Sequence, residues 1–362
     1  MYHPFSLKTT DTHESRFLFF DDLKTLWEKA CGQSHAGGTD PVLIVDERVH
    51  AAHRSRINDA FPSGTARMFL VPSGESSKSV TQWNYIIDFT FADMVRRNTP
   101  VIAIGGGVTG DLAGFAAATL LRGLPLYHVP TTLLAMVDSA VGGKTGINHA
   151  FGKNTIGAFY QPEAVLFDTA FLDTLPQREW LCGISEVLKY GYIAEPLLLE
   201  TAARLAEPHS RDRQILHDVI TQSVRIKSSI VAEDTREAGK RAWLNFGHTF
   251  GHALETLDNY RHINHGEAVY AGMIAALHTS RCLGWEAPDA PLLEMKKIFG
   301  LALDPYTSRI DELVTLMTHD KKNRNSQIRL VLIEKTGSPV VHPVDDSGIL
   351  RDAWKYTFDA LA

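Results

Sequence analysis

The chain has 362 residues, of which 44% are hydrophobic and 22% are charged. This composition is typical of a globular protein and excludes collagen-like and largely disordered chains. The 36 Lys and Arg and 42 Asp and Glu residues give a formal net charge of −6, which argues against the positive surface that non-specific nucleic-acid binding requires. Three widely spaced cysteines, an odd number, imply no disulfide framework. Without a signal-peptide pattern or a bilayer-length apolar run, we expect a cytoplasmic protein with no nucleic-acid or membrane partner.

In the first half of the chain, short apolar runs alternate with longer amphipathic segments. A helix is predicted over residues 79–97 from its apolar periodicity. The predicted strands are residues 41–46, 67–71, 101–104, 126–129 and 164–167. Strands that alternate with helices indicate an α/β domain with a mainly parallel sheet.

The pattern changes after residue 176, where apolar residues mostly recur at helical spacing. The predicted helices are residues 178–194, 197–206, 212–232, 243–257, 267–283 and 291–299. Only residues 328–333 are predicted as a strand in this half. We therefore expect two domains that share a cleft, an α/β domain over residues 1–176 and a mostly helical domain over residues 177–362.

A glycine-rich loop follows the third predicted strand. The segment Gly105-Gly-Gly-Val-Thr-Gly-Asp111 fits the pattern G-x-G-x-x-G and leads into a helical stretch, as in loops that bind a pyrophosphate at a helix N-terminus. The acidic residue expected about 20 positions further on is absent, because Tyr127 and His128 lie there. A tight turn that only allows close packing therefore remains an alternative. Asp46, at the end of an earlier strand, is a candidate for binding a ribose hydroxyl or a simple turn residue.

Histidines and one acid form a candidate metal site. His248 and His252 are four residues apart in a helical segment, so they project from one face. His265 follows a short loop, and Glu186 lies on an earlier helix. Imidazoles and a carboxylate from separate elements suit catalytic zinc, with one position open for substrate. The spacing leaves open whether His248 and His252 are ligands together, or whether the histidines are core or capping residues.

Several cations lie beside glycines and polar residues. Lys144 follows two glycines, and Lys189 is three residues after Glu186 on the same helical face. The others are Arg122, Lys153, Lys227, Arg241, Lys321 and Lys322. Each alone is explained by a solvated surface charge, but together they suit a phosphate or carboxylate ligand.

These motifs occur in the order found in one known family. They are Gly105–Asp111, Pro130-Thr-Thr132, Val137-Asp-Ser139, Gly142-Gly-Lys-Thr145, Gly152-Lys-Asn-Thr-Ile-Gly157, Glu186-Val-Leu-Lys189, Leu244-Asn-Phe-Gly-His-Thr-Phe-Gly-His252, His265-Gly-Glu-Ala-Val269 and Asp320-Lys-Lys322. From about residue 42 to about residue 335 the chain resembles the 3-dehydroquinate synthases, which are sugar phosphate cyclases. The first 40 residues match no motif of that family.

The resemblance implies a Rossmann-like NAD-binding domain joined to a helical metal-binding domain, with the site between them. It also implies a lyase of the shikimate pathway of aromatic amino-acid biosynthesis. Such an enzyme converts the seven-carbon sugar phosphate DAHP to 3-dehydroquinate and phosphate. NAD oxidises the substrate, phosphate is eliminated, the hydride returns, and an intramolecular aldol reaction closes the ring. A homodimer that binds NAD and Zn²⁺ or Co²⁺ is expected on the same ground.

The resemblance also assigns site residues. The metal ligands would be Glu186, His248 and His265, with His252 at the substrate instead. The NAD contacts would be Asp46, Glu75, Lys78, Gly106, Gly107, Val108, Asp111, Thr131, Thr132, Lys153 and Thr174. The catalytic and substrate-contacting residues would be Arg122, Asp138, Lys144, Asn154, Lys189, Lys227, Glu237, Arg241, Asn245, His252 and Lys321, with Lys322 as the alternative to Lys321.

Three alternatives remain at this point. An amino-dehydroquinate synthase shares these motifs, whereas cyclases whose substrates lack the carboxylate should differ around Lys144, Arg241 and Asn245. Polyol and glycerol-phosphate dehydrogenases share the expected fold, metal and coenzyme, but they release reduced coenzyme. An inactive binding module is disfavoured because the metal and lysine residues are all present.

Overall fold

The structure is a computed structural model that describes residues 13–20, 22–31, 40–207, 212–235, 239–318 and 328–362. The chain divides into two compact units, the first formed by residues 1–130 and 143–168 and the second by residues 131–142 and 169–362. This division differs from a single boundary near residue 176, because residues 131–142 belong to the second unit.

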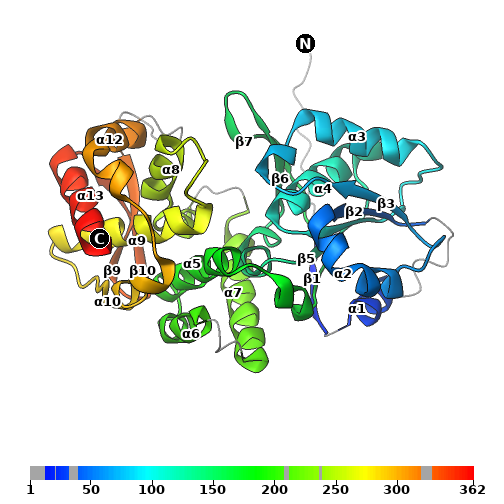
Figure 1. Ribbon diagram of the computed structural model, residues 1–362, viewed down its shortest axis with the longest axis horizontal. Coiled ribbons are helices and arrows are strands. Elements are labelled where there is room, and N and C mark those ends of the chain that lie inside the picture. Colours follow the sequence, from blue (N-terminus) through cyan, green and yellow to red (C-terminus); the bar gives the residue numbers. More distant parts are fainter. Residues whose placement is uncertain (1–12, 21, 32–39, 208–211, 236–238, 319–327) are drawn as a thin grey trace, which may run out of the picture. The chain divides into compact units, whose positions relative to one another are not determined.

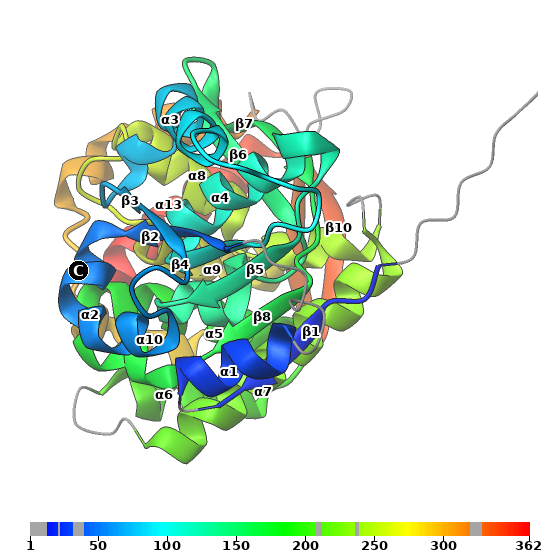
Figure 2. The same cartoon turned by 90° about the vertical axis from the view of Figure 1, so that its right-hand side faces the viewer.

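The first unit contains a six-stranded parallel sheet (Figure 2). Its strand order is β1 (Arg16–Phe19), β8 (Ala164–Phe167), β5 (Leu126–Pro130), β4 (Val101–Gly105), β2 (Val42–Asp46) and β3 (Arg67–Val71). The five predicted strands are thus confirmed. The sequence did not predict the edge strand β1, which has only four residues and a partly exposed face.

Helices cover both faces of this sheet (Figure 1). On one face lie α1 (Leu23–Cys31) and α2 (Glu47–Ala60). On the other lie α3 (Val80–Phe91), α4 (Gly107–Thr119) and the antiparallel hairpin of β6 (Lys144–His149) and β7 (Gly152–Phe159). On this second face of the sheet, the hydrophobic core consists of aliphatic side chains from the strands and from α4. The predicted helix over 79–97 ends at Phe91, and Ser79 caps its start by accepting from Gln82 N.

The second unit is mostly helical. Its main helices are α5 (Gln177–Ile193), α6 (Leu197–Ala206), α7 (Arg213–Glu233), α8 (His248–Leu257), α9 (His265–Cys282), α12 (Ile310–Thr318) and α13 (Ser347–Leu361). Short helical segments are η4 (Ala135–Ser139), η5 (Thr169–Thr174), η6 (Lys240–Asn245), α10 (Ala290–Leu293), α11 (Lys296–Phe299) and η7 (Asp304–Arg309). The predicted helix over 243–257 is broken, because Gly247 takes a left-handed conformation (φ 78°) between η6 and α8.

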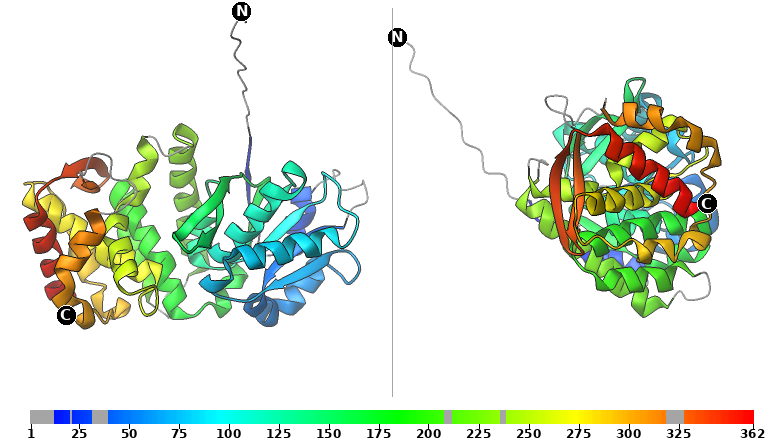
Figure 3. Two further views of the ribbon diagram at one scale, coloured as in Figure 1. Left: turned by 90° about the horizontal axis from the view of Figure 1, so that it is seen from above. Right: turned by 90° about the vertical axis from the view of Figure 1, so that its left-hand side faces the viewer.

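Helix α9 is the centre of this unit and is buried along most of its length. It packs against α5, α8, α13 and strand β9 (Ile328–Lys335), as Figure 3 shows for the red helix α13 and the neighbouring strands. The expectation of only one strand in this half is wrong. Strand β10 (Ser338–Val344) pairs with β9 as an antiparallel hairpin. The sequence did not predict β10 because it contains Pro339 and Pro343, and proline is unfavourable in strands except at an edge.

No helix in the described ranges has both the length and the apolar character needed to cross a membrane.

Candidate functional site

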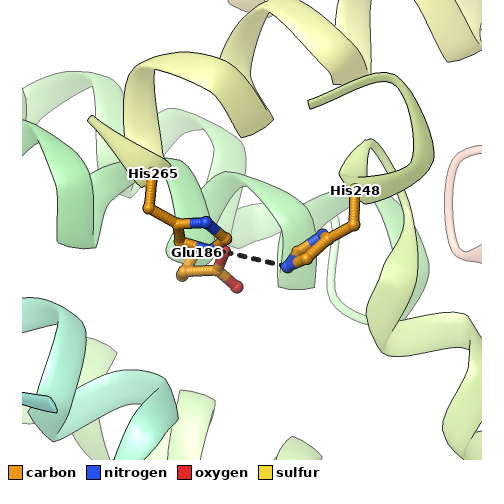
Figure 4. A group of neighbouring side chains, drawn as sticks. All are labelled: Glu186, His248 and His265. Atoms are coloured by element: carbon orange, nitrogen blue, oxygen red, sulfur yellow. Dashed lines mark ion pairs between the residues drawn. The ribbon is translucent and has the colours of Figure 1, made fainter. Parts of the chain in front are cut away.

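Glu186, His248 and His265 meet in the second unit (Figure 4). Glu186 lies in the middle of α5, while His248 and His265 are the first residues of α8 and α9. Each histidine places its Nε2 atom 3.6 Å from Glu186 Oε1. One ligand atom from each residue lies within 4.8 Å of the other two. The structure therefore groups His248 with Glu186 and His265, and not with His252 alone.

The donor set fits a divalent metal ion. Both carboxylate oxygens of Glu186 are buried; Oε1 faces the two histidines, and Oε2 forms an ion pair with Lys189. His248 Nδ1 lies 3.1 Å from the Phe246 carbonyl oxygen, and His265 Nδ1 lies 3.6 Å from Glu255 Oε1. In each ring the Nδ1 atom thus faces an oxygen atom, and the Nε2 atom faces the carboxylate of Glu186, as in catalytic zinc sites of the His₂Glu type.

The start of α9 is fixed by a capping box and an ion pair. The Asn264 side chain accepts from Glu267 N at 2.9 Å, and Glu267 Oε2 accepts from Asn264 N at 2.9 Å. Arg178, near the start of α5, donates to both Glu267 oxygens at 2.6 Å. These contacts hold the N-terminus of the helix that carries His265 against the helix that carries Glu186.

A close backbone approach brings the same two helices together deeper in the unit. Gly266 N donates to the Cys182 sulfur at 3.1 Å. A Cβ atom at Gly266 would lie 2.3 Å from Cys182 Cα, so only glycine fits here. Cys182 is one helical turn before Glu186, and Gly266 follows His265, so this contact sets the separation of the two candidate ligands.

Burial and charge shift the pKa values of this cluster in opposite directions. Burial lowers the pKa of His248 to about 3, against the attraction of Glu186. Burial opposes ionisation of Glu186, but Lys189 outweighs it and the pKa of Glu186 is lowered. Burial also opposes protonation of His265, but Glu186 and Glu255 raise its pKa to about 10. A cation at this position would compete with a proton for His265, as metal ions do at their ligands.

An ion cluster centred on Asp138 adjoins the histidines through Lys189. Lys189 forms ion pairs with both Glu186 and Asp138. Lys227 Nζ lies 2.9 Å from Asp138 Oδ2 and donates to the Asp138 backbone oxygen at 2.8 Å. Burial disfavours the charged Asp138, but Lys189 and Lys227 bring its pKa well below the usual range.

Sequence reasoning missed one member of this cluster. Tyr190 donates from its hydroxyl to Asp138 Oδ1 at 2.6 Å. Burial and the nearby carboxylates raise the pKa of Tyr190, which keeps it a donor. Asp138 itself lies on a π-helical turn, a distortion often found at functional sites. The only sequence signal for Tyr190 is its position next to Lys189.

Three other predicted residues of the second unit lie on η6 and α8. Arg241 is buried and donates to the backbone oxygens of Gly142 at 3.0 Å and Thr235 at 2.6 Å. Asn245 donates to the Ala242 oxygen at 3.2 Å, and the His252 ring centroid lies 5.6 Å from that of His248. The predicted residues Glu237, Lys321 and Lys322 lie outside the described residues.

In the first unit, four predicted residues are joined in one network. Lys78 is buried, forms an ion pair with Asp111 and donates to Asn154 Oδ1. Asn148 donates to Glu75 Oε1 at 2.7 Å and accepts from Asn154 N at 2.9 Å. Gly106 precedes α4, and Gly107, Val108 and Asp111 lie in its first turns, so the backbone N–H groups of a helix start adjoin this network.

The remaining predicted residues of the first unit lie at loops and strand ends. Asp46 accepts from Arg48 N at 2.9 Å and Val49 N at 3.2 Å, so it also caps α2. Arg122 (φ 68°) and Asn154 (φ 54°) have left-handed backbones, which non-glycine residues adopt at a cost and often at functional sites. Lys144 and Lys153 lie on β6 and β7.

Three residues predicted to bind NAD belong to the second unit by contact. Thr131 is buried, Thr132 Oγ1 accepts from Ala135 N at 3.1 Å, and Thr174 ends η5. The candidate NAD contacts are thus divided between the two units.

Comparisons with known proteins identify the family. Residues 68–182 match the family model described as 3-dehydroquinate synthase N-terminal, and residues 183–323 match the one described as 3-dehydroquinate synthase C-terminal. A curated 3-dehydroquinate synthase from Salinibacter ruber is 44% identical over 320 residues, which is 87% of each chain.

Solved structures show the same fold. A 2-deoxy-scyllo-inosose synthase in complex with carbaglucose-6-phosphate, NAD⁺ and Co²⁺ is 25% identical, with a TM-score of 0.77 over 94% of this chain and 96% of that one. The 2-epi-5-epi-valiolone synthase of Streptomyces hygroscopicus, with NAD⁺ and Zn²⁺ bound, is 22% identical, with a TM-score of 0.86 over 98% and 99% of the two chains. The chain therefore belongs to the 3-dehydroquinate synthase family.

Proposed function

We propose that this chain performs the reaction of its family, the conversion of DAHP to 3-dehydroquinate and phosphate in the shikimate pathway, through the residues described above. The observation that carries the proposal is the group formed by the buried Glu186 with the half-buried His248 and His265, joined by Lys189 to the cluster of Asp138 and Lys227. It combines metal-ligand chemistry with buried positive charge, which suits an anionic sugar substrate.

The cofactor assignment is NAD with Zn²⁺ or Co²⁺. A divalent ion bound by Glu186, His248 and His265 would polarise a substrate hydroxyl, and NAD would accept a hydride and return it. The solved 2-deoxy-scyllo-inosose synthase holds NAD⁺ and Co²⁺, which supports both groups. In the first unit, the N-terminus of α4 offers backbone N–H groups to a pyrophosphate.

The cations of the chain bind the anionic groups of the substrate. Lys189, Lys227 and Arg241 are buried, where a charge-assisted hydrogen bond to phosphate or carboxylate is stronger than in water. Asp138 holds both lysines in place through ion pairs. Lys144 and Asn154 complete the set in the first unit, and much of the rate gain comes from fixing a flexible sugar in one conformer.

The proton transfers are assigned to two groups. In the elimination step, the phosphate group of the substrate accepts the proton that the neighbouring carbon loses. The phosphate oxygens can do so because they are basic and belong to the reacting molecule. His252 relays protons, since its ring lies 5.6 Å from that of His248 and 6.3 Å from that of His265.

The test supplies DAHP with catalytic NAD and a divalent metal to the full chain. We expect one phosphate per DAHP, 3-dehydroquinate as the product and no net NADH absorbance. Phosphate release without a carbocyclic product would leave the elimination and remove the cyclase assignment. Net NADH formation from a polyol would indicate a dehydrogenase instead, and preference for an amino analogue of DAHP would indicate an amino-dehydroquinate synthase.

We also infer that the protein is a cytoplasmic homodimer. It binds a small-molecule substrate and has no nucleic-acid or membrane partner. The family resemblance supports the dimer, and the net charge of −6 disfavours nucleic acid. Sedimentation of the purified chain tests the dimer.

A further inference from the structure

A second buried carboxylate lies behind one of the candidate metal ligands. Glu255 is 4% exposed, and its Oε1 atom lies 3.6 Å from His265 Nδ1. It follows His248 and His252 on α8 at spacings that place all three side chains on one helix face. No sequence motif used above includes Glu255.

The geometry decides which nitrogen of His265 faces Glu186. His265 Nε2 lies 3.6 Å from Glu186 Oε1, and Nδ1 lies 3.6 Å from Glu255 Oε1. At this distance the Glu255 carboxylate attracts the proton of Nδ1 electrostatically. It thereby favours the neutral tautomer that carries its proton on Nδ1, whose Nε2 lone pair is directed at the candidate metal position.

The two histidines differ in this respect. The Nδ1 atom of His248 faces the neutral carbonyl oxygen of Phe246, whereas that of His265 faces a charged carboxylate. A carboxylate makes the imidazole a stronger ligand than a carbonyl does, because it stabilises positive charge that the ring acquires on binding a cation. His265 is therefore the ligand whose strength depends on a second side chain.

We propose that Glu255 is a positioning residue that orients His265 and increases its affinity for a divalent ion. The proposal rests on the metal site proposed above. The alternative to this role is a second metal site, because His252, Glu255 and His265 also place three ligand atoms within 4.8 Å of one another. In that arrangement Glu255 would bind a second ion directly.

The experiment titrates Co²⁺ into the full, metal-free chain and into Glu255→Gln. Affinity is measured by competition with a chromophoric chelator, stoichiometry by metal analysis, and ligand geometry by the visible Co²⁺ spectrum. We expect one ion per wild-type chain, about 10- to 100-fold weaker binding to E255Q, and a shifted spectrum. Glu255→Asp, which keeps the charge but shortens the side chain, should lie between the two.

Glu267→Gln is the matched control. Glu267 also contacts the start of α9, but through Asn264 and Arg178, away from His265 Nδ1. Gln at this position keeps the acceptor of the capping box and loses only the charge that pairs with Arg178. We therefore expect E267Q to lower the melting temperature of the metal-free chain and to change Co²⁺ affinity by less than about threefold.

The outcomes separate this inference from the metal site itself. Equal Co²⁺ affinity of wild type and E255Q would overturn the role of Glu255 and leave the metal site standing. An equal loss of affinity in E255Q and E267Q would also overturn it, because general destabilisation of α9 would explain both. Two ions per chain, one lost in E255Q, would make Glu255 a ligand, and no bound ion in the wild type would overturn the metal site as well.

Discussion

The two units present their candidate site residues in opposite ways. In the second unit, Glu186 is fully buried and Lys189 is 1% exposed, and side-chain charges hold one another in place. In the first unit, Lys144 and Arg122 lie on the surface, and the main feature is the backbone at the start of α4. For a ligand, the first unit therefore offers backbone N–H groups and exposed cations, whereas the second offers a prearranged set of buried charges.

This difference has consequences for variants. Removing one partner of a buried charge cluster leaves the others uncompensated, which is costly. Removing an exposed lysine takes away a ligand contact and leaves the fold nearly unchanged. Variants at the buried charges of the second unit should therefore change both stability and function, and variants at the exposed cations of the first unit mainly function.

The largest expected effect is that of His248→Ala. It removes one of three candidate ligands, so we expect loss of bound metal and a fall in turnover of at least about 1,000-fold. Metal analysis and phosphate release measure the two effects. His252→Ala is the control and should keep its metal, because His252 is outside the group of Glu186, His248 and His265. Full metal content and full activity in H248A would show that the ligand assignment is wrong.

A smaller effect is expected in the first unit. Lys144→Ala should weaken substrate binding about 100-fold and leave NAD binding nearly unchanged, because the lysine supplies a charge-assisted contact to an anion. Separate titrations with NAD and with a substrate analogue measure the split. Asp46→Asn should show the reverse preference. If K144A lost mainly NAD affinity, Lys144 would belong to the nucleotide site.

Two glycines allow the units to be compared directly. A Cβ at Gly266 would lie 2.3 Å from the Cys182 backbone, whereas one at Gly110 on α4 would lie 3.5 Å from the ring of His128, an ordinary van der Waals contact. We expect Gly266→Ala to cost about 2–4 kcal/mol and Gly110→Ala to change the free energy of unfolding by no more than about 1 kcal/mol, measured by urea unfolding with and without metal. G266A should also weaken metal binding, and an unchanged affinity would mean that the Cys182 contact does not position His265.

Local patterns predicted much of this fold. The runs at 101–104 and 164–167 became buried strands of the sheet, because continuous apolar residues suit a parallel sheet that is covered on both faces. The spacing of Glu186 and Lys189 predicted their shared helix face, and the ion pair follows from it. Strand β10 was not predicted because its two prolines argue against a strand.

Contacts between distant segments were beyond that reasoning. Tyr190 reaches Asp138 across 52 positions of the chain, and Glu255 acts on His265 only because α8 and α9 pack together. Helical spacing places Glu255 on the face of His248 and His252, but neither this spacing nor the position of Tyr190 next to Lys189 identifies the partner, which depends on the tertiary fold. The family resemblance supplied the ligand set that spacing alone had left open, but it did not include these supporting residues.

The smallest expected effect concerns a carboxylate that supports the loop before His265. Asp258 Oδ2 accepts from the backbone N–H groups of Arg261, His262 and Ile263 at 2.6–2.9 Å, and Tyr306 donates to Oδ1 at 2.6 Å. Burial acts to raise the pKa of Asp258, but these hydrogen bonds hold it well below the usual range. The charged form is therefore favoured by the folded state.

The sign of the pH dependence follows from this shift. The contribution of Asp258 to the free energy of unfolding is complete above the pKa of an unfolded aspartate, about 3.9. It is lost as the pH falls toward the lower pKa that Asp258 has in the folded state. Asp258→Asn should cost about 1–3 kcal/mol at pH 7, with a difference from wild type that shrinks below about pH 4. Asp46→Asn, at the half-buried N-cap of α2, should cost only a few tenths of a kcal/mol. Urea unfolding of the metal-free chain from pH 3 to pH 7 measures both, and a D258N difference that is the same at every pH would show that the hydrogen bonds do not depend on the charge of Asp258.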